Sequence, residues 1–550
     1  MSVTDHDFVR WDDPQNIYNN PQITSLSWDG IRQAWNPSSG AMVYQPIDYM
    51  VLASTASLAK LDVPNRTICE SGALLDPRTF HELSLMLHVI NCLLVYALML
   101  ILFPQRKFGC LLGSLLFGLH PLQVESVAWA SSVDRCINGT LSIVSLLTYV
   151  SAVKEERVYS RRLLYAAAVL AGVAAYLAKP VAITLPIAAL LLDRYVLGRD
   201  WKNTLTWYIP WQLALLPLLV LTTQSTNMDA GISTPLWTRP FIAGDALTWH
   251  LEKLIAPFNL AFDYGRTPHY LLKHWWGYAT SIVPASLLLG AYLLRRNRCV
   301  LAAAGLWLAA LLPDIGLVPF PFQRYSTVAD RYDYLALLGP CLAATALFPM
   351  LRWRYSQVTG SAIIVICAGL SAVQLATWQD TPSLIAQELS VNPDSIIGHV
   401  NMGVYYADHG QISKAIPLYL DAIRLDSTNY YALSNLGCIY MDMGRKIEAE
   451  KYLRLATARQ ANYLEPYFRL GMLFYSEGRL NDCIAEYRRI LEINPHALIA
   501  GTNLAVALGR AGRRDEAVME VNKVLKANPK SAQSQRVLQA LSDGAYKQWK

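Results

Sequence analysis

Two adjacent carboxylates near the start of the chain, Asp12 and Asp13, are the first residues whose types and spacing could do chemistry. Neighbouring carboxylates repel each other, so one of them can have a raised pKa and accept a proton from a substrate as a general base. An Asp-Asp-Pro run is also typical of turns and helix starts. The local sequence therefore leaves a catalytic and a structural interpretation open.

The composition indicates the kind of element that must position these carboxylates. The chain has 550 residues, of which 53% are hydrophobic and only 16% charged, whereas soluble domains are about one quarter charged. The charge deficit lies before about residue 380, where apolar runs reach membrane-spanning length. We expect spans near 81–103, 108–126, 136–153, 162–178, 180–197, 203–223, 275–294, 299–317, 332–351 and 359–377. The prediction is a transmembrane domain over 81–380, preceded by an external loop region over 1–80.

Basic residues cluster in every second loop of this predicted bundle. The clusters are Arg106-Lys107, Lys154 to Arg162, Arg194 to Lys202, Arg295 to Arg298, and Arg352 with Arg354. The positive-inside rule places these loops in the cytoplasm, so residues 1–80, 224–274, 318–331 and the C-terminal tail face the other side. Because 1–80 must then cross the membrane, we expect a helix upstream of Met1 rather than insertion driven by the first helical hairpin. The net charge of +6 is explained by these loops, and we expect no nucleic-acid partner.

The tail repeats every 34 residues. Met402-Gly403, Leu436-Gly437, Leu470-Gly471 and Leu504-Ala505 keep this step, which is typical of the helix–turn–helix of a tetratricopeptide repeat. We predict four repeats over 395–530, beginning near 395, 429, 463 and 497, and a capping helix and tail over 531–550. The predicted fold class is therefore all-α: a polytopic transmembrane helical bundle followed by an α-solenoid. Stacked repeats leave a concave groove, where Asn401, Tyr405, Asn435, Tyr467 and Asn503 are candidates for holding an extended peptide of a protein partner.

Several ordered blocks along the chain carry a more specific signal. They are Trp11-Asp12-Asp13 with Ile17-Tyr18-Asn19-Asn20-Pro21 and the helix from Trp28 to Trp35, Gly118 to Trp129, Leu177-Ala178-Lys179-Pro180, Leu190 to Asp193, Gly316 to Pro319, and Ala329 to Tyr332. In this order the chain resembles the transmembrane and tetratricopeptide-repeat (TMTC-type) O-mannosyltransferases and their bacterial relatives. Those proteins are polytopic glycosyltransferases of the GT-C class. The resemblance covers the chain from about residue 8 to about residue 530.

The resemblance implies a donor in which a sugar, mannose first, is carried on a polyprenyl phosphate such as dolichyl phosphate. The acceptor would be a Ser or Thr hydroxyl of a protein on the non-cytoplasmic side. In GT-C enzymes an acidic residue of the first external loop acts as base, which maps to Asp13 first and Asp12 second. Cations must hold the phosphate leaving group, and the candidates are Lys179, Arg331, Arg135, Lys253 and Arg324. An ammonium at the depth of Lys179 favours contact with an anion, although snorkelling to the interface is an alternative.

His120, Glu125 and Asp330 are candidates for binding substrate. His120 and Glu125 stand five residues apart at the outer end of a span, where they could bind a metal or sugar hydroxyls, or fix a loop by hydrogen bonds to the backbone. Asp330 could instead pair with Arg331 to anchor a helix end. The nine cysteines are scattered and predict neither disulfides nor a zinc site. We therefore assign no metal ligands, while a divalent ion remains an open cofactor.

The departures from the family pattern keep other functions open. The turn after Trp129 reads Ser131-Ser132-Val133-Asp134-Arg135 where relatives usually carry a basic and then an acidic residue. One alternative is a membrane glycosyltransferase that acts on a glycan or lipid, and another is a non-catalytic membrane-anchored repeat scaffold. In all of these readings the chain is a multi-pass protein of the bacterial inner membrane or the endoplasmic reticulum membrane, with its repeats on the periplasmic or lumenal side.

Overall fold

The computed structural model describes residues 3–20, 23, 27–37, 43–61, 74–225, 234–348 and 353–544. Pro21 and Arg352 of the sequence predictions, and the last residues of the predicted span 332–351, lie outside these ranges. The described residues form helices, with one isolated bridge between Lys60 and Leu75 and no strand among them. The chain divides into two compact units, Met1–Pro393 and Asp394–Lys550. The predicted all-helical fold class is confirmed.

Six helical segments of the first unit are long and apolar enough to cross a membrane, counted over the described residues. They are α3 (Pro77–Leu102), Ala130–Lys154 with α6 (Val133–Lys154), α7 (Val158–Ala178), Pro180–Leu197 with α8 (Leu185–Leu191), the α9 span Trp201–Thr223, and the Gln357–Thr377 part of α17 (Trp353–Thr377). A seventh candidate is bent by 49° between α4 (Lys107–Leu119) and Pro121–Ala128, which contains α5 (Val124–Ala128). At ~1.5 Å per residue, each covers or approaches the ~30 Å hydrocarbon thickness. The first unit is thus that of a multi-pass membrane protein.

Three predicted spans are wrong as continuous crossings. The run 275–294 is broken into α12 (Trp275–Ala279) and α13 (Ile282–Leu293). The run 299–317 contains only α14 (Arg298–Leu311), which ends before Pro313, and 332–351 contains the short helices α15 (Asp333–Ala336) and α16 (Leu338–Leu347). Apolar composition records burial in lipid or protein but not helix continuity, so hydropathy overestimated these three lengths.

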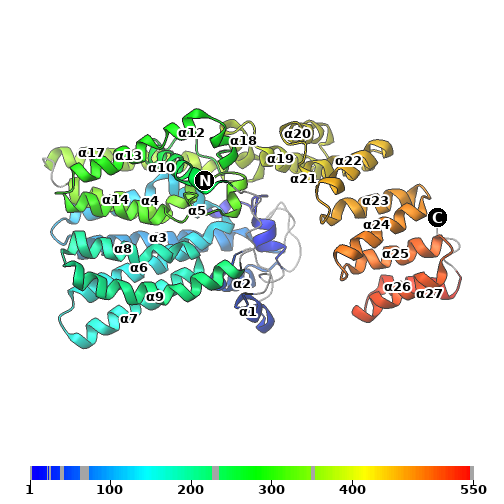
Figure 1. Cartoon of the computed structure of the whole chain (residues 1–550), viewed down its shortest axis with the longest axis horizontal. Coiled ribbons are helices and arrows are strands. Elements are labelled where there is room, and N and C mark those ends of the chain that lie inside the picture. The colour runs from blue at the N-terminus through cyan, green and yellow to red at the C-terminus, as the bar shows by residue number, and fades with distance from the viewer. Residues whose placement is uncertain are drawn as a thin grey trace. The chain divides into compact units, whose positions relative to one another are not determined.

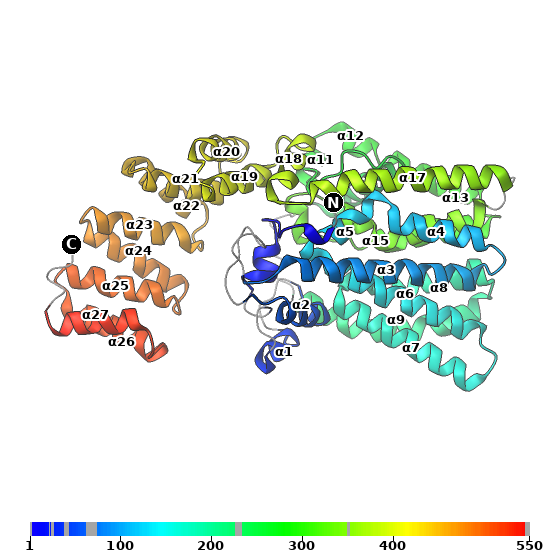
Figure 2. The same ribbon diagram turned by 180° about the vertical axis from the view of Figure 1, so that it is seen from behind.

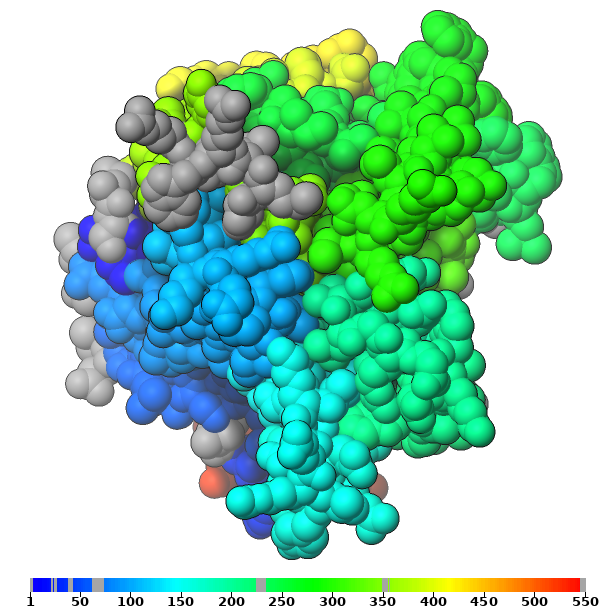
Figure 3. All heavy atoms as spheres, turned by 90° about the vertical axis from the view of Figure 1, so that its left-hand side faces the viewer, coloured from blue at the N-terminus to red at the C-terminus, as the bar shows by residue number. Residues whose placement is uncertain are grey.

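The basic loops share one end of the membrane unit. Figures 1 and 2 show α3, α4, α6, α7 and α9 running side by side, with α1 (Trp28–Ala34) and α2 (Pro46–Leu58) at the opposite end. Figure 3 looks onto the basic end, where the connections α3–α4, α6–α7, α8–α9 and α13–α14 gather. This arrangement agrees with the alternation of charge along the sequence and separates the basic loops from α1 and α2.

Close packing holds the bundle together at its centre. Trp211 of α9 is fully buried and lies against Gly172 of α7, where an added Cβ would come within 2.7 Å of the indole nitrogen. Tyr149 of α6 packs beside the same indole, with ring centroids 5.7 Å apart. A side chain larger than glycine at 172 would therefore displace α9 from α7.

The second unit consists of paired helices followed by a single helix. They are α19 (Ile396–Asp408), α20 (Ile412–Leu425), α21 (Tyr430–Asp442), α22 (Lys446–Arg459), α23 (Leu464–Ser476), α24 (Leu480–Ile493), α25 (Leu498–Arg510), α26 (Arg514–Ala527) and α27 (Ala532–Ser542). The small residue of the 34-residue period allows each pair to pack closely, since a Cβ on Gly437 would lie 2.8 Å from Leu453 and one on Gly471 would lie 2.7 Å from Tyr487.

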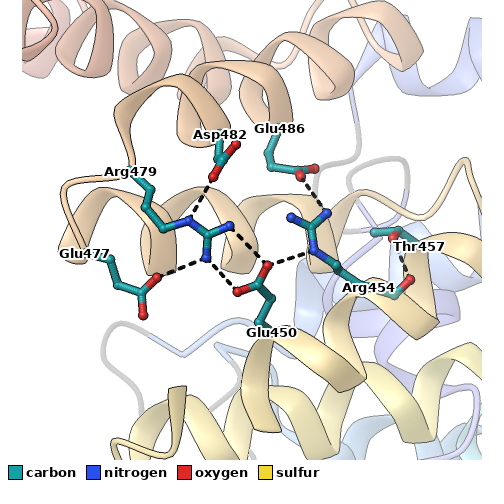
Figure 4. Close-up of polar contacts among 7 residues, drawn as sticks. All are labelled: Glu450, Arg454, Thr457, Glu477, Arg479, Asp482 and Glu486. Carbon is teal, nitrogen blue, oxygen red and sulfur yellow. Dashed lines mark hydrogen bonds and ion pairs between the residues drawn. The ribbon is translucent and has the colours of Figure 1, made fainter. Parts of the chain in front are cut away.

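An ion-pair network joins the second and third helix pairs (Figure 4). Glu450 of α22 accepts hydrogen bonds from Arg454 Nε at 2.9 Å and from Arg479 Nη1, just before α24, at 2.7 Å. Arg479 also bonds Asp482 at 2.8 Å, and Arg454 lies 3.6 Å from Glu486. These groups are partly exposed, so each pair alone contributes little to stability, whereas the network as a whole links neighbouring repeats.

Candidate functional site

The segment 7–13, here called the N-terminal strap, crosses the end of the membrane unit opposite the basic loops. The Asp7 N–H donates to the Gln379 carbonyl at 3.1 Å, and the Arg10 N–H donates to Thr381 Oγ1 at 3.0 Å. Phe8 packs edge-on against Phe80 of α3, with ring centroids 5.6 Å apart. The strap is therefore held between the start of α3 and the junction of α17 with α18 (Thr381–Val391).

Asp13 ties the strap to the turn before α6. Its side chain is fully buried, and Oδ2 accepts a 2.8 Å hydrogen bond from the Val9 N–H. Oδ1 accepts from both the N–H, at 3.0 Å, and the hydroxyl of Ser131. Burial raises the pKa of Asp13 to about 7, and these hydrogen bonds oppose the rise. Both carboxylate oxygens are thus already engaged with the protein.

Asp12 has a different environment from its neighbour. Its side chain is half-buried, and its carboxylate has no hydrogen bond to any other residue in the described ranges. Burial raises the pKa of Asp12, while the charge of Arg331 lowers it. Asp12 is therefore a carboxylate with free acceptor positions and a guanidinium nearby.

Arg331 is held in place by Glu125 and by aromatic rings. Glu125 of α5 accepts from Arg331 Nη1 at 2.5 Å and from the Arg331 N–H at 2.8 Å. The guanidinium carbon lies 4.3 Å from the centroid of Phe322 and 5.4 Å from that of Trp129. The bend between α4 and α5 brings Glu125 to this position, so two sequence blocks more than 200 residues apart meet at one ion pair.

Two further cations complete the cluster. Arg135 Nη1 lies 3.2 Å from Asp314 Oδ2, and Lys179 forms an ion pair with Asp134. The ring of Tyr332 lies 5.1 Å from the guanidinium carbons of both Arg135 and Arg331. Lys179 is within electrostatic range of Arg331 and Asp314. Three of the five predicted phosphate-binding cations, Arg135, Lys179 and Arg331, therefore lie together.

Asp48 also belongs to this cluster, although sequence reasoning did not select it. It lies in the first turn of α2 and is only 2% exposed, and its Oδ2 accepts from Gln45 Nε2 at 3.2 Å. Burial raises the pKa of Asp48 to about 7, while the neighbouring Lys179 lowers it. An acidic residue just after Pro46 looks like an ordinary helix start in the sequence, so no local signal distinguishes it.

An apolar groove opens below the cations. One wall is a single face of α6, with Arg135, Asn138, Ser142 and Leu146 at helical spacing. The remaining lining is Val181, Ala182, Thr184, Leu185, Ala188, Leu306, Ala310, Tyr332, Tyr334, Leu335 and Leu338. We call it the membrane groove; its polar head is Arg135 and Tyr332, and its body is mostly aliphatic.

The other predicted residues have contacts of their own. His120 accepts from the Leu122 N–H at 3.3 Å through Nδ1 and lies 3.1 Å from the Leu254 carbonyl through Nε2, so it fixes a loop. Lys253 donates to the Phe258 carbonyl at 2.9 Å. Asp330 accepts from the Tyr264 hydroxyl at 2.7 Å.

Arg324 is exposed, 5.7 Å from the ring centroid of Tyr325. No group of three metal-ligating side chains occurs in the part of the chain that the structure describes.

The predicted groove residues of the repeat unit do not all share one surface. Asn401, Tyr405, Asn435 and Asn503 are partly exposed. Tyr467 is instead buried in the core of the repeats, and its hydroxyl donates to the Ala461 carbonyl at 3.2 Å. Tyr467 packs the repeats together and is not part of a peptide surface.

Fold and site together define a multi-pass helical membrane protein with a tetratricopeptide-repeat tail. The tetratricopeptide repeat family matches residues 430–463 and 464–496. Among solved structures, the YrrB tetratricopeptide repeat protein is 18% identical, covers 30% of this chain and 85% of its own, and superposes with a TM-score of 0.27. MamA is 28% identical over 27% of this chain and 81% of its own, with a TM-score of 0.25.

Curated relatives extend over the membrane unit as well. Protein O-mannosyl-transferase F38B6.6 of Caenorhabditis elegans is 22% identical over 78% of this chain and 61% of its own length. The mouse protein O-mannosyl-transferase TMTC4 is 24% identical over 62% of this chain and 54% of its own length. Mouse protein O-mannosyl-transferase TMTC1 is 32% identical over 46% of this chain and 28% of its own length. The predicted resemblance to TMTC-type O-mannosyltransferases is confirmed. The chain spans about half to three fifths of the length of the first relatives it matches.

Proposed function

We propose that this protein transfers a mannosyl group from a polyprenyl-phosphate carrier to Ser or Thr hydroxyls of a protein on the non-cytoplasmic side of the membrane. The observation that carries the proposal is Asp12, a carboxylate with free acceptor positions on which the charge of Arg331 acts, while Arg331 belongs to a cluster of three cations and Arg135 of that cluster lines an apolar groove. A general base, a phosphate site and a lipid site are the three parts that such a transfer requires.

The donor lipid would lie with its phosphate at the cations and its tail in the membrane groove. Arg135 belongs both to the cation cluster and to the groove lining, so it links the two. Glu125 engages only Nη1 of the Arg331 guanidinium, which leaves other N–H groups for phosphate oxygens. The aliphatic lining suits an isoprenoid chain, because burying apolar surface is favourable at about 25 cal/mol per Å².

In the reaction, Asp12 takes the proton of the acceptor hydroxyl while the oxygen of that hydroxyl forms a bond to the anomeric carbon of the mannosyl group. The bond from that carbon to the phosphate oxygen breaks, and the cations stabilise the departing phosphate. From the sequence, Asp13 ranked before Asp12 as the base. The contacts favour the reverse order, because the oxygens of Asp13 are occupied by Val9 and Ser131.

The repeats would recruit the acceptor on the same side. Helix α18 follows the last span, and its first residue, Thr381, contacts the strap that contains Asp12. The basic loops gather at the other end of the unit, which the positive-inside rule assigns to the cytoplasm. Both observations support repeats on the periplasmic or lumenal side.

The test is transfer of radiolabelled mannose from mannosyl-phosphoryl-polyprenol to protein, in membranes with and without the full chain. Matched membranes carrying the Arg135→Gln Arg331→Gln variant control for other transferases. We expect labelled protein only with the native chain. Equal labelling in all three membranes, from mannosyl and glucosyl donors alike, would contradict the proposal and favour the scaffold alternative.

A further inference from the structure

The cation cluster has more carboxylates around it than it has cations. Arg135, Lys179 and Arg331 are each paired, with Asp314, Asp134 and Glu125 in that order. Two carboxylates of the cluster form no ion pair with described residues, Asp12 on the Arg331 side and Asp48 on the Lys179 side. Asp12 has a role as the proposed base, whereas Asp48 has none.

Asp48 is buried with an unused acceptor. Its Oδ1 has no hydrogen-bond partner and its Oδ2 has only Gln45. Asp134, which is 6% exposed, likewise uses one oxygen for Lys179 and leaves Oδ1 without a partner. Burying carboxylate oxygens without donors is costly, so a site that keeps two of them around one ammonium is built for a ligand that brings donors.

The chemistry of the cluster indicates which donors fit. A metal ion is disfavoured, because the Lys179 ammonium already lies in contact with Asp134 and near Asp48. If Asp48 were only a second counter-ion of Lys179, the Oδ1 atoms of Asp48 and Asp134 would still have no hydrogen-bond donor. Hydroxyl groups fit better, since each can donate to a carboxylate and accept from an ammonium at the same time.

We propose that Asp48 is a specificity-determining residue, which accepts a hydrogen bond from a hydroxyl of the transferred hexose, with Asp134 Oδ1 and Lys179 completing the hydroxyl-binding subsite. This inference rests on the proposed function, because the hexose is the sugar of the lipid donor. It places the ring between the base Asp12 and α2, so that the sugar is recognised by a helix of the N-terminal region rather than by the bundle alone.

The test compares donors that each lack one hydroxyl. The purified full chain is assayed with mannosyl-phosphoryl-polyprenol and its 2-, 3-, 4- and 6-deoxy analogues, as native protein, Asp48→Asn and Asp29→Asn. Asp29 is exposed on α1 and provides the matched control. We expect the native protein and Asp29→Asn to lose at least about 100-fold in kcat/KM with one deoxy donor, because a buried polar site rejects a substrate that lacks its partner group. In Asp48→Asn the loss for that same donor should shrink to within about threefold.

Each other outcome overturns the inference or the function beneath it. If every deoxy donor is used within about threefold of the parent by the native protein, no hydroxyl is read and the inference fails, whether or not Asp48→Asn folds. If Asp48→Asn keeps the full discrimination, Asp48 is only a structural partner of Lys179. If the native protein transfers no mannose from the parent donor, the proposed function itself fails. Should Asp48→Asn not give a monodisperse protein, Gln45→Leu, which removes the one hydrogen bond to Asp48, is expected to weaken discrimination at the same hydroxyl.

Discussion

Two neighbouring residues of one type have distinct environments in this protein. Asp13 accepts three hydrogen bonds and joins the strap to the turn before α6, whereas the carboxylate of Asp12 bonds to none of the described residues and is influenced by the charge of Arg331. The hydrogen-bond partners, rather than the residue type, separate a structural aspartate from a candidate base.

The raised pKa of Asp13 predicts a pH-dependent stability. Its folded value of about 7 exceeds the ordinary value of 3.8, so between these values the folded protein binds more protons than the unfolded chain. The contribution of Asp13 to stability therefore falls as the pH rises from 4 to 7. The pKa of Asp48 is also raised, to about 7, and adds to the same loss of stability. Asp13→Asn should therefore make the decrease in Tm between pH 5 and pH 8 smaller without abolishing it. Thermal unfolding in detergent measures this, and an unchanged slope would contradict the assignment.

Glu125 is expected to act as a positioning residue for Arg331. Glu125→Gln keeps the shape of the side chain but removes the charge that holds the guanidinium. We expect the rate of transfer to fall by roughly 10- to 100-fold, because small misplacements of reacting groups cause losses of that size. The KM for the lipid donor should rise. Arg331→Lys alone and combined with Glu125→Gln gives the control, since the two effects should not add if the residues act as one unit. Additive losses would show that Glu125 acts elsewhere.

The sequence predicted part of this residue-scale picture. Lys179 was selectable because a charge beside an apolar span is costly unless it has a role, whereas Arg135 and Arg331 were selected as cations that could hold a phosphate. Which carboxylate is a structural hydrogen-bond acceptor and which is the candidate base was not predictable, because this depends on contacts such as that of Ser131 with Asp13. Asp48 was missed since nothing near it in the sequence marks it as part of a site.

At the scale of elements, helix breaks matter as much as helices. The bend at His120-Pro121 carries Glu125 under Arg331, and the short helices α14, α15 and α16 form one side of the membrane groove. Long apolar helices such as α3 were predicted well, as 81–103 for the observed Pro77–Leu102, because hydropathy over 20 residues is a strong signal. The break at Thr280-Ser281 was not, because the apolar run continues through it.

The membrane groove makes a prediction about chain length. Ala188 lines the groove, so Ala188→Phe should fill part of it and raise the KM for a long-chain donor by roughly tenfold, about 1.4 kcal/mol of lost binding. The exposed Ala167 of α7 provides the matched control, Ala167→Phe. Kinetics with donors of two and of eleven isoprene units measure the effect, which should be smaller for the shorter lipid. An equal change in both variants would argue that the lipid lies elsewhere.

At the scale of the whole molecule, the protein combines a membrane unit with a repeat unit that has its own core. The repeat period and its small residues were enough to predict the second unit, since stacked repeats depend on local contacts. Which surface of the repeats meets a partner was not predictable, as the buried Tyr467 shows.

Removal of the repeats tests their proposed role in acceptor recruitment. A chain lacking 395–550 should lose transfer to protein at least tenfold more than it loses hydrolysis of the lipid donor, because the proposed donor site lies in the first unit. Both activities are measured on the same membranes at matched expression. An equal loss of transfer to protein and of donor hydrolysis would contradict a role of the repeats in acceptor recruitment.

The central claim is that Asp12 is the base for sugar transfer, and the most direct measurement is the initial rate from mannosyl-phosphoryl-polyprenol with the purified full chain. We predict that Asp12→Asn lowers the rate at saturating donor by at least about 100-fold, as loss of a general base does, with donor binding within about threefold of native. Asp13→Asn should retain measurable transfer once its lower stability is allowed for. A native rate in Asp12→Asn, with loss of transfer in a folded Asp13→Asn, would contradict the account.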